Sequence, residues 1–577
     1  MATRGERFDL IVRNGMLVDG SGNPRRRADV GVRAGRIAAL GQLGDATAEE
    51  VIDADGLVLA PGIIDPHTHY DPQITWDPYA TASCFHGVTT VLAGNCGFSV
   101  APTRPDDRRF FAGLFAKVEG MAPVALDGIQ WEFETFPEFV ATRGGSLGVN
   151  LACYVGHCNL RRWVMGDEGS ARPATAVEVV EMGRILREAM DAGAAGLSST
   201  HAPTHNDGDN HPVPSRFAEP DELLALAEEL GRTNRGTITY LPRSAVGGLD
   251  RADMDLLVEL GRVSGLPVII QGLGGRNKVD APGADWKTAL EFLERARAAG
   301  SAVYSLLLAR PFDRPFTLAE GTTLYEGVPQ WDRVVAPTVT DRSRLLGDPA
   351  VRDAMRDAVE HPNRDPDRGS TLPPPHWDVL FVGSVADPAL ADRVGRSVLD
   401  IAREQGVTPA DAMLDLAVAD GLETQFRWVT ETDEWMSAVR EAQHNPHMIT
   451  GTSDGGAHLS RDDGSDYSTY FLRRWVLDLG EWTLEQGVRQ LTSVPATVLG
   501  FRDRGLVQTG NWADLMVFDP EAIRQPGRKV LVHDLPGGIG RFQAYPNGIR
   551  ATLVNGVPIV LDGVLTGRRP GQVVSPV

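Results

Sequence analysis

Short apolar segments recur through the middle of the chain and are separated by stretches with helical periodicity. The apolar segments span residues 61–69, 87–95, 148–157, 193–200, 236–243, 267–274, 301–309 and 447–454. The intervening helical patterns include "AVEVVEMGRILREAMDAG", "PDELLALAEELG", "DMDLLVELGRVSG" and "WKTALEFLERARAAG", each of which ends on glycine, a common helix stop. Buried strands that alternate with amphipathic helices are typical of a parallel sheet, and eight strands is the number that closes a (β/α)8 barrel.

The two ends of the chain carry a different pattern. "LIVRNGMLVDGSG" near the start and "TLVNGVPIVLDGVLTG" near the end are apolar runs broken by Asn-Gly, a strong hairpin-turn signal. We therefore predict an α/β protein with a TIM-like barrel at residues 61–500. A small β-sandwich domain is expected to be built from both termini, residues 1–60 and 501–577.

Two stretches interrupt the alternation of strands and helices. The first, residues 98–147, follows the second predicted strand, and the second, residues 310–446, precedes the last one. Insertions in the loops of a barrel lie on its catalytic face and commonly shape access to the substrate. We expect the same of these two.

Composition narrows the class of partner. The 577 residues carry a formal net charge of −21, which argues against nucleic acid and anionic membranes. The N-terminus lacks the apolar core of a secretory signal, and no run of 18 apolar residues occurs. The sequence predicts a cytoplasmic protein that acts on a small molecule, with reduced thiols at its four cysteines, and it leaves open whether the protein is a homo-oligomer.

The first apolar segment ends in an unusual way, "APGIIDPHTHYDPQ". His67 and His69 are two residues apart, so in an extended strand both imidazoles point to the same side. Two converging neutral nitrogens make a site for zinc or a similar ion, whereas histidine pairs on ordinary solvent faces need no such role. Because this pair ends an apolar strand at the catalytic face, we favour the metal.

The last predicted strand offers a third ligand. It ends "TGTSDGGAH", which delivers Asp454 to the same rim beside glycines that permit close backbone approach. A carboxylate there can contact the metal and accept a proton from water. Asp454 can also cap the following segment, and both roles can hold at once.

With these residues in place, the sequence resembles the amidohydrolase superfamily. The motifs "GNCGFSVAP" and "YVGHCNLRRWVMG" and the large insertion resemble its N-acyl-D-amino-acid deacylase (D-aminoacylase) branch. The resemblance covers essentially the whole chain. It implies metal-dependent hydrolysis of an amide or related C–N bond, with zinc as the usual ion. It also implies that His67, His69 and Asp454 hold one metal and that Cys96 is a ligand of the neighbouring position.

The chain departs from this branch at two positions. Such deacylases carry a histidine after strand five and another after strand six, but here Leu241 and the pair Gln271 and Gly272 stand in those places. None of the four lysines lies at the catalytic end of a strand, except for Lys278 past a glycine turn, so a carboxylated lysine bridge is not expected. We predict one zinc ion, with Cys96 as either its fourth ligand or a buried thiol.

Further polar residues lie at the same predicted rim. His201 and His205 follow strand four and are candidates for substrate contact or for a replacement ligand, while His211 reads as part of a polar lid. His157 is a candidate for catalysis, either by holding the substrate carbonyl or by orienting the metal-bound water, with a structural hydrogen bond as the alternative. Arg243 is a candidate for binding the substrate carboxylate, since a guanidinium matches it bidentately, and a rim salt bridge is the alternative.

The expected function is hydrolysis of an N-acyl-D-amino acid or a related N-acyl compound, with Asp454 as the base. A second hypothesis keeps the metal and changes the substrate to a cyclic amide, a carbamate or an aryl urea. A third hypothesis is a pseudoenzyme that binds ligands without turnover. This hypothesis does not explain why His67, His69 and Asp454 occur together.

Overall fold

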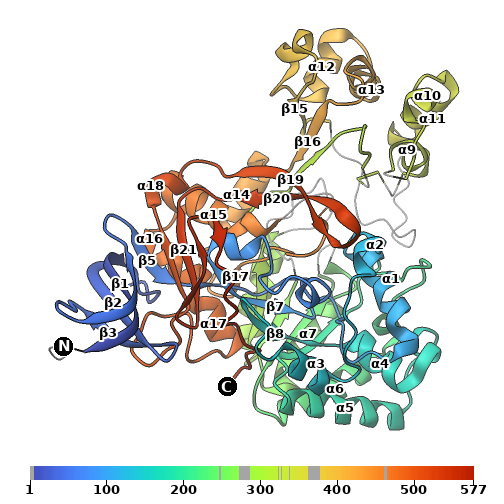
Figure 1. The fold of residues 1–577 in the computed structure, drawn as a ribbon. Helices are drawn as coiled ribbons and strands as arrows, with labels where there is room; N and C mark the ends of the chain where they lie inside the picture. Colours follow the sequence, from blue (N-terminus) through green and yellow to red (C-terminus); the bar gives the residue numbers. More distant parts are fainter. Residues whose placement is uncertain are drawn as a thin grey trace.

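Parallel strands form the centre of the molecule (Figure 1). The structure is a computed structural model, and it describes residues 6–245, 249–271, 286–322, 324–325, 328–336, 338–360, 377–459 and 464–577. One sheet contains β6 (Ile63–Asp65), β7 (Val88–Ala93) and β8 (Asn150–Cys153). A second contains β9 (Val155–Gly156), β10 (Gly196–Thr200), β11 (Thr237–Leu241), β12 (Val268–Ile270), β13 (Val303–Leu307) and β17 (Met448–Thr450). Each of the eight predicted apolar segments therefore contains a parallel strand, and the parallel α/β prediction is confirmed.

The two sheets meet at both of their edges. Only Tyr154 separates β8 from β9 along the chain. At the other edge, Thr68 after β6 forms an isolated parallel bridge with Gly455 after β17, and the His69 amide donates to the Gly455 carbonyl at 2.8 Å. These contacts bring the segments that follow the first and last strands of the series side by side.

Helices between the strands cover the buried sheet. They include α5 (Ala176–Asp191), α6 (Pro220–Gly231), α7 (Arg251–Ser264) and α8 (Trp286–Ala298), at the positions that the apolar periodicity predicts. Thr175 and Glu178 form a capping box at the start of α5, and Gly265 ends α7 with φ of 68°. The strand β10, buried along its whole length, needs such cover on its outer face.

Both ends of the chain contribute to one nine-stranded sheet. From the N-terminus come β1 (Arg7–Leu17), β2 (Arg26–Arg33), β3 (Arg36–Gly41), β4 (Thr47–Asp53) and β5 (Val58–Pro61), and from the C-terminus β18 (Leu515–Phe518), β21 (Ile549–Val554), β22 (Val557–Leu561) and β23 (Val564–Leu565). Antiparallel pairing of β5 with β18 joins the two groups. Gly62 then leads directly into β6, and a Cβ there would lie 2.2 Å from Thr89 Oγ1, so only glycine fits this passage.

The predicted insertion at 310–446 contains a small antiparallel sheet and helices with their own apolar cluster. Its strands are β14 (Asp313–Phe316), β15 (Leu380–Ser384) and β16 (Gln425–Val429), and its helices are α9 (Pro329–Val335), α10 (Arg342–Leu346), α11 (Pro349–Glu360), α12 (Val398–Gln405) and α13 (Pro409–Ala419). The rings of Tyr325 and Trp331 stack at 4.2 Å inside this cluster. The unit projects from the rest of the molecule (Figure 1), whereas α14 (Asp433–Ala442) returns to the central core.

The other interruption, residues 98–147, contains α1 (Arg108–Val118), α2 (Pro123–Leu126) and α3 (Phe136–Arg143). A hairpin of β19 (Arg528–Leu535) and β20 (Ile539–Tyr545) reaches across to α2 (Figure 1). There Leu535 packs with Ala125 and with Leu459 from the loop after β17. The first interruption and the C-terminal hairpin thus both pack against the segment that follows the last parallel strand. Within the described ranges, no helix is long and apolar enough to cross a membrane.

Candidate metal centre

His67 and His69 lie just beyond the end of β6 and are buried, with exposed fractions of 3% and 0%. Thr68 between them is held in place by its amide and hydroxyl, which donate to the Leu92 carbonyl at 2.9 and 2.7 Å. The Asp65 carboxylate accepts from the His67 amide at 3.3 Å. The two imidazole centroids lie 5.1 Å apart, so the spacing of two residues brings the rings together as the sequence predicts.

Asp454 reaches the same place from the loop after β17. Its Oδ1 atom lies 3.3 Å from Nε2 of His67 and 3.3 Å from Nε2 of His69. The predicted close approach of the following glycines is confirmed, since a Cβ on Gly456 would lie 2.8 Å from the His69 carbonyl oxygen. Two imidazole nitrogens therefore converge on one carboxylate oxygen.

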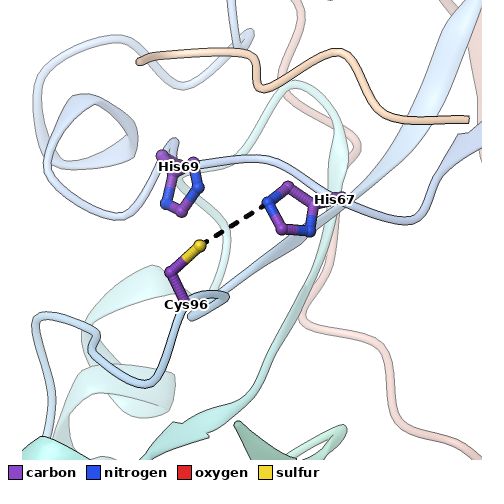
Figure 2. A group of neighbouring side chains, drawn as sticks. All are labelled: His67, His69 and Cys96. Atoms are coloured by element: carbon purple, nitrogen blue, oxygen red, sulfur yellow. Dashed lines mark hydrogen bonds between the residues drawn. The ribbon is translucent and has the colours of Figure 1, made fainter. Parts of the chain in front are cut away.

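Cys96 follows β7 and completes one side of the cluster. Figure 2 shows its sulfur directed at His67, with Sγ and Nε2 separated by 3.9 Å. The Cys96 thiol also donates to Gln271 Oε1 at 3.3 Å, and Gln271 Nε2 donates to Thr239 Oγ1 at 2.8 Å. Gln271 thus contacts the thiol from the strand-six position, where a histidine is expected in the deacylases that this chain resembles. Gly272 and Lys278 lie outside the described residues.

Glu119, which no sequence motif marks, is the second carboxylate of the cluster. It directly follows α1, is only 2% exposed, and places Oε1 3.4 Å from Nδ1 of His69. Its Oε2 lies 3.9 Å from Nε2 of His458, whose own Nε2 is 3.7 Å from Asp454 Oδ2. No local motif marks Glu119, because only the packing of residues 98–147 against the loop after β17 brings it to His69.

Three members of the cluster have left-handed backbone conformations. The φ angles are 55° for Cys96, 56° for Asp454 and 53° for His458. Such angles are uncommon for residues other than glycine and cost on the order of 1–3 kcal/mol each when they are held in place by the surrounding structure. Their concentration around two histidines is typical of a functional site.

The charges of the cluster are strongly perturbed. Burial raises the pKa of Glu119 well above its usual range, and the nearby carboxylates of Asp454 and Asp71 raise it further. Burial acts in the same direction on Asp454, but the adjoining imidazoles of His67 and His69 outweigh it and hold the pKa of Asp454 well below its usual range. Burial lowers the pKa of His69 and raises that of the Cys96 thiol.

The residues present fit a zinc ion. Nε2 of His69 is buried without a hydrogen-bond partner, a costly state that an ion would relieve. Imidazole, thiolate and carboxylate are the usual zinc ligands, and ligands about 2.1 Å from a tetrahedral ion lie roughly 3.4 Å apart. The two 3.3 Å separations, from His67 Nε2 and from His69 Nε2 to Asp454 Oδ1, match that spacing.

His157 lies in a separate buried network. Its Nδ1 is 2.8 Å from Ser199 Oγ and its Nε2 is 3.0 Å from Glu222 Oε1. Arg161 also binds both oxygens of Glu222, at 2.6 and 2.5 Å. Both nitrogens of His157 are therefore engaged, which favours the structural alternative for this residue.

His201 and His205 occupy different surroundings. His205 is buried, its Nδ1 lies 3.0 Å from Thr200 Oγ1, and the cluster residues His67, His69 and Asp454 all influence its pKa, which burial lowers to about 3. His201 contacts the Tyr240 hydroxyl at 2.7 Å and the Ala218 carbonyl at 3.1 Å. His205 is thus the nearer of the two to the metal cluster in electrostatic terms.

Arg243 follows β11 and is exposed. Its positive charge acts on both His201 and Tyr240, so it lies near the rim beside them. His211 is exposed as well, with its Nδ1 3.8 Å from Asp207.

Comparison with known proteins places this cluster in context. The model of the amidohydrolase family matches residues 50–560. D-aminoacylase of Alcaligenes xylosoxydans xylosoxydans is 30% identical over 573 residues, which cover 98% of each chain. N-acyl-D-glutamate deacylase of the same organism is 29% identical and covers 90% of this chain and 88% of its own.

Solved structures give the same picture. N-acyl-D-glutamate deacylase from Bordetella bronchiseptica, complexed with zinc and a phosphonate inhibitor, is 26% identical with a TM-score of 0.64, and the match covers 99% of this chain and all of that one. A D-aminoacylase whose binuclear metal centre is described by one-metal activation and second-metal attenuation is also 26% identical, with a TM-score of 0.63 and coverage of 98% and 100%.

Proposed function

The chain belongs to the amidohydrolase family, and from this premise we propose that it hydrolyses an N-acyl-D-amino acid or a related N-acyl compound. The family and its deacylase relatives make the chain a hydrolase of carbon–nitrogen bonds other than peptide bonds. The observation that carries the proposal is the convergence of His67 Nε2 and His69 Nε2 on Asp454 Oδ1, each at 3.3 Å.

We propose one zinc ion per chain. His67, His69 and Asp454 would hold it, with Cys96 as the fourth ligand. A second ion in the neighbouring position would need imidazoles where Leu241 and Gln271 stand, and neither side chain is a good zinc ligand. Gln271 instead contacts Cys96, and with its amide reversed it would donate to a Cys96 thiolate while accepting from Thr239.

A bound zinc ion would lower the pKa of a water molecule and polarise the substrate carbonyl. Asp454 would take the proton from the attacking water, because its carboxylate is held ionised beside His67 and His69. It would then return that proton to the nitrogen that leaves when the C–N bond breaks. The other carboxylate oxygen, Oδ2, faces His458, which would hold Asp454 in place during both transfers.

Recognition of the substrate would fall to residues on the rim. Arg243 is the proposed partner of the substrate carboxylate, since it is exposed and its guanidinium can bind a carboxylate bidentately. His205, which follows β10, would contact the acyl half, whereas the contacts of both His201 nitrogens with Tyr240 and Ala218 support a structural role for that residue. The engagement of His157 with Ser199 and Glu222 supports the structural alternative over a catalytic role for this residue.

The proposal includes a closed barrel. The bridge between Thr68 and Gly455 supports closure between the first and last strands, and with it a barrel over residues 61–500. The proposed β-sandwich would consist of residues 1–60 and 501–577, which share a sheet, and the insertions would cover about residues 98–147 and 310–446.

A substrate panel tests the proposal. The zinc-loaded protein would be assayed with N-acetyl and N-formyl derivatives of D- and L-amino acids, and with hydantoins, carbamates and aryl ureas. Release of free D-amino acids that disappears on chelation is the expected result. Turnover confined to the cyclic amides, carbamates or ureas would contradict the deacylase assignment, and no turnover of any compound by zinc-loaded protein would contradict hydrolysis of these bonds.

A further inference from the structure

We propose that Glu119 is a positioning residue for the metal centre, acting through His69. This inference rests on the proposed function, because it takes the metal to lie between His67, His69 and Asp454. Glu119 comes from residues 98–147, outside the motifs of the strand ends. It therefore adds to the site a group that the HxH motif and the strand-eight aspartate do not imply.

The two nitrogens of His69 face different carboxylates. Nε2 lies 3.3 Å from Asp454 Oδ1, and Nδ1 lies 3.4 Å from Glu119 Oε1. A neutral imidazole carries one proton, and the nitrogen that carries it cannot bind a metal. With Nε2 directed at the metal, the proton must be on Nδ1, and Glu119 is the carboxylate placed to accept it.

The burial of Glu119 argues against a purely structural role for its carboxylate. The residue is 2% exposed, and Oε1 is buried without a hydrogen-bond partner. A buried carboxylate is destabilising unless it is paired, so a role in the fold alone is a poor reason for glutamate here. A carboxylate that accepts a proton from a metal-binding histidine fixes its tautomer, fixes the ring orientation and strengthens its binding to the ion.

Glu119 also ties this histidine to the loop that carries Asp454. The His458 amide donates to the Glu119 carbonyl at 2.6 Å, and Glu119 Oε2 lies 3.9 Å from His458 Nε2. His458 Nε2 in turn lies 3.7 Å from Asp454 Oδ2. Glu119 thus faces His69 directly and lies beside the histidine that faces Asp454, so its loss is expected to weaken the hold of His69 on the metal.

Zinc affinity of the full-length Glu119→Gln protein tests the inference. This variant keeps the shape of the side chain and removes the charge. Competition with a chromogenic chelator is expected to show zinc bound roughly 10- to 100-fold more weakly than by the wild type. The metal-free protein should melt at or above the wild-type temperature, because glutamine keeps the shape of the side chain and places no charge in the buried site. Cobalt-loaded protein should keep its d–d absorption bands, since the metal ligands are unchanged. The exposed Glu132, on the same stretch, provides a matched control as Glu132→Gln.

The outcomes separate this inference from the proposed function. Wild type and Glu119→Gln binding zinc with equal affinity, while His69→Ala loses it, would overturn the role of Glu119 and leave the metal centre intact. A metal-free Glu119→Gln protein that melts well below the wild type would show a structural residue and also overturn it. Shifted cobalt bands would make Glu119 a direct ligand, against the positioning role. Wild-type protein that binds no zinc would overturn the proposed function itself.

Discussion

Oδ1 of Asp454 lies 3.3 Å from Nε2 of His67, although the two residues follow the last and the first strand of the parallel series. This contact forms only when the two ends of the series are brought together. The bridge between Thr68 and Gly455, next to these two residues, holds that arrangement through the backbone. The fold and the proposed chemistry therefore depend on the same few hydrogen bonds.

Replacement of Asp454 with asparagine removes the proposed base and keeps its shape. General acid–base catalysis contributes about 100- to 10,000-fold, so kcat should fall by at least roughly 100-fold. Circular dichroism and the melting temperature of the metal-free protein should stay close to wild type. A variant that retains full kcat would contradict the assignment of Asp454 as the base.

Replacement of Cys96 with serine tests whether the thiol is a ligand. A thiolate bound to cobalt gives an intense charge-transfer band in the near ultraviolet, which a hydroxyl cannot give. We expect the band in the cobalt-loaded wild type and its loss in Cys96→Ser. Identical spectra for the two proteins would mean that Cys96 is a buried thiol whose only role is its hydrogen bond to Gln271.

Gln271→His returns an imidazole to the position that contacts Cys96. Because Gln271 Oε1 already lies 3.3 Å from Sγ, the new ring should reach the same space and raise the affinity for a second equivalent of zinc. Titration with zinc under a chelator buffer would measure it, with Gln271→Ala as the control. Unchanged stoichiometry in Gln271→His would show that Leu241 alone suffices to prevent a second ion.

Removal of the metal should destabilise the native protein. An ion that binds only the folded state adds about 2.7 kcal/mol when its concentration is 100 times its Kd. Thermal melts with excess chelator should therefore fall below melts with zinc, and re-addition of zinc should restore both the melting temperature and turnover. The same comparison on His67→Ala serves as control, since this variant should melt at one temperature in both conditions.

Acid should destabilise the fold through His201. Burial lowers the pKa of His201 from 6.5 to about 4, partly offset by its hydrogen bond to the Ala218 carbonyl. Below pH 6.5 the His201 imidazole binds a proton in the unfolded chain, whereas in the folded chain it binds one only near pH 4. Stability is thus complete above pH 6.5 and falls by up to about 3 kcal/mol between pH 6.5 and 4.

Chemical denaturation of metal-free protein at several pH values measures this loss. His201→Asn should show a shallower decline across the window, and the exposed His211→Asn should behave as wild type. Equal slopes for the wild type and His201→Asn would mean that His201 is protonated in the folded state as readily as in the unfolded one.

Much of this architecture is predictable because its signals are local. The periodicity of residues 176–193 predicts a helix that the structure has as α5, and the apolar segment at 193–200 contains β10. The spacing of His67 and His69 predicts converging rings because a two-residue period belongs to any extended strand. Asn-Gly turns at both ends predict β-structure there, and the structure joins those ends in one sheet.

The remainder depends on contacts between distant segments. No sequence motif marks Glu119, because its place beside His69 depends on the packing of residues 98–147 against the loop that carries His458. The engagement of His157 by Ser199 and Glu222 also escapes the sequence, since neither partner lies within a recognisable spacing. The contact of Gln271 with Cys96 is also not predictable from the sequence. Gln271 stands where a histidine ligand is expected, and in the structure it accepts a hydrogen bond from the Cys96 thiol.

Anomalous diffraction from a zinc-loaded crystal tests the central claim most directly. Difference maps from data on the two sides of the zinc absorption edge would locate the ion without reference to any assay. We predict one peak per chain, within bonding distance of His67 Nε2, His69 Nε2 and Asp454 Oδ1. The absence of a peak there in zinc-saturated protein, or a peak bound by other residues alone, would contradict the account.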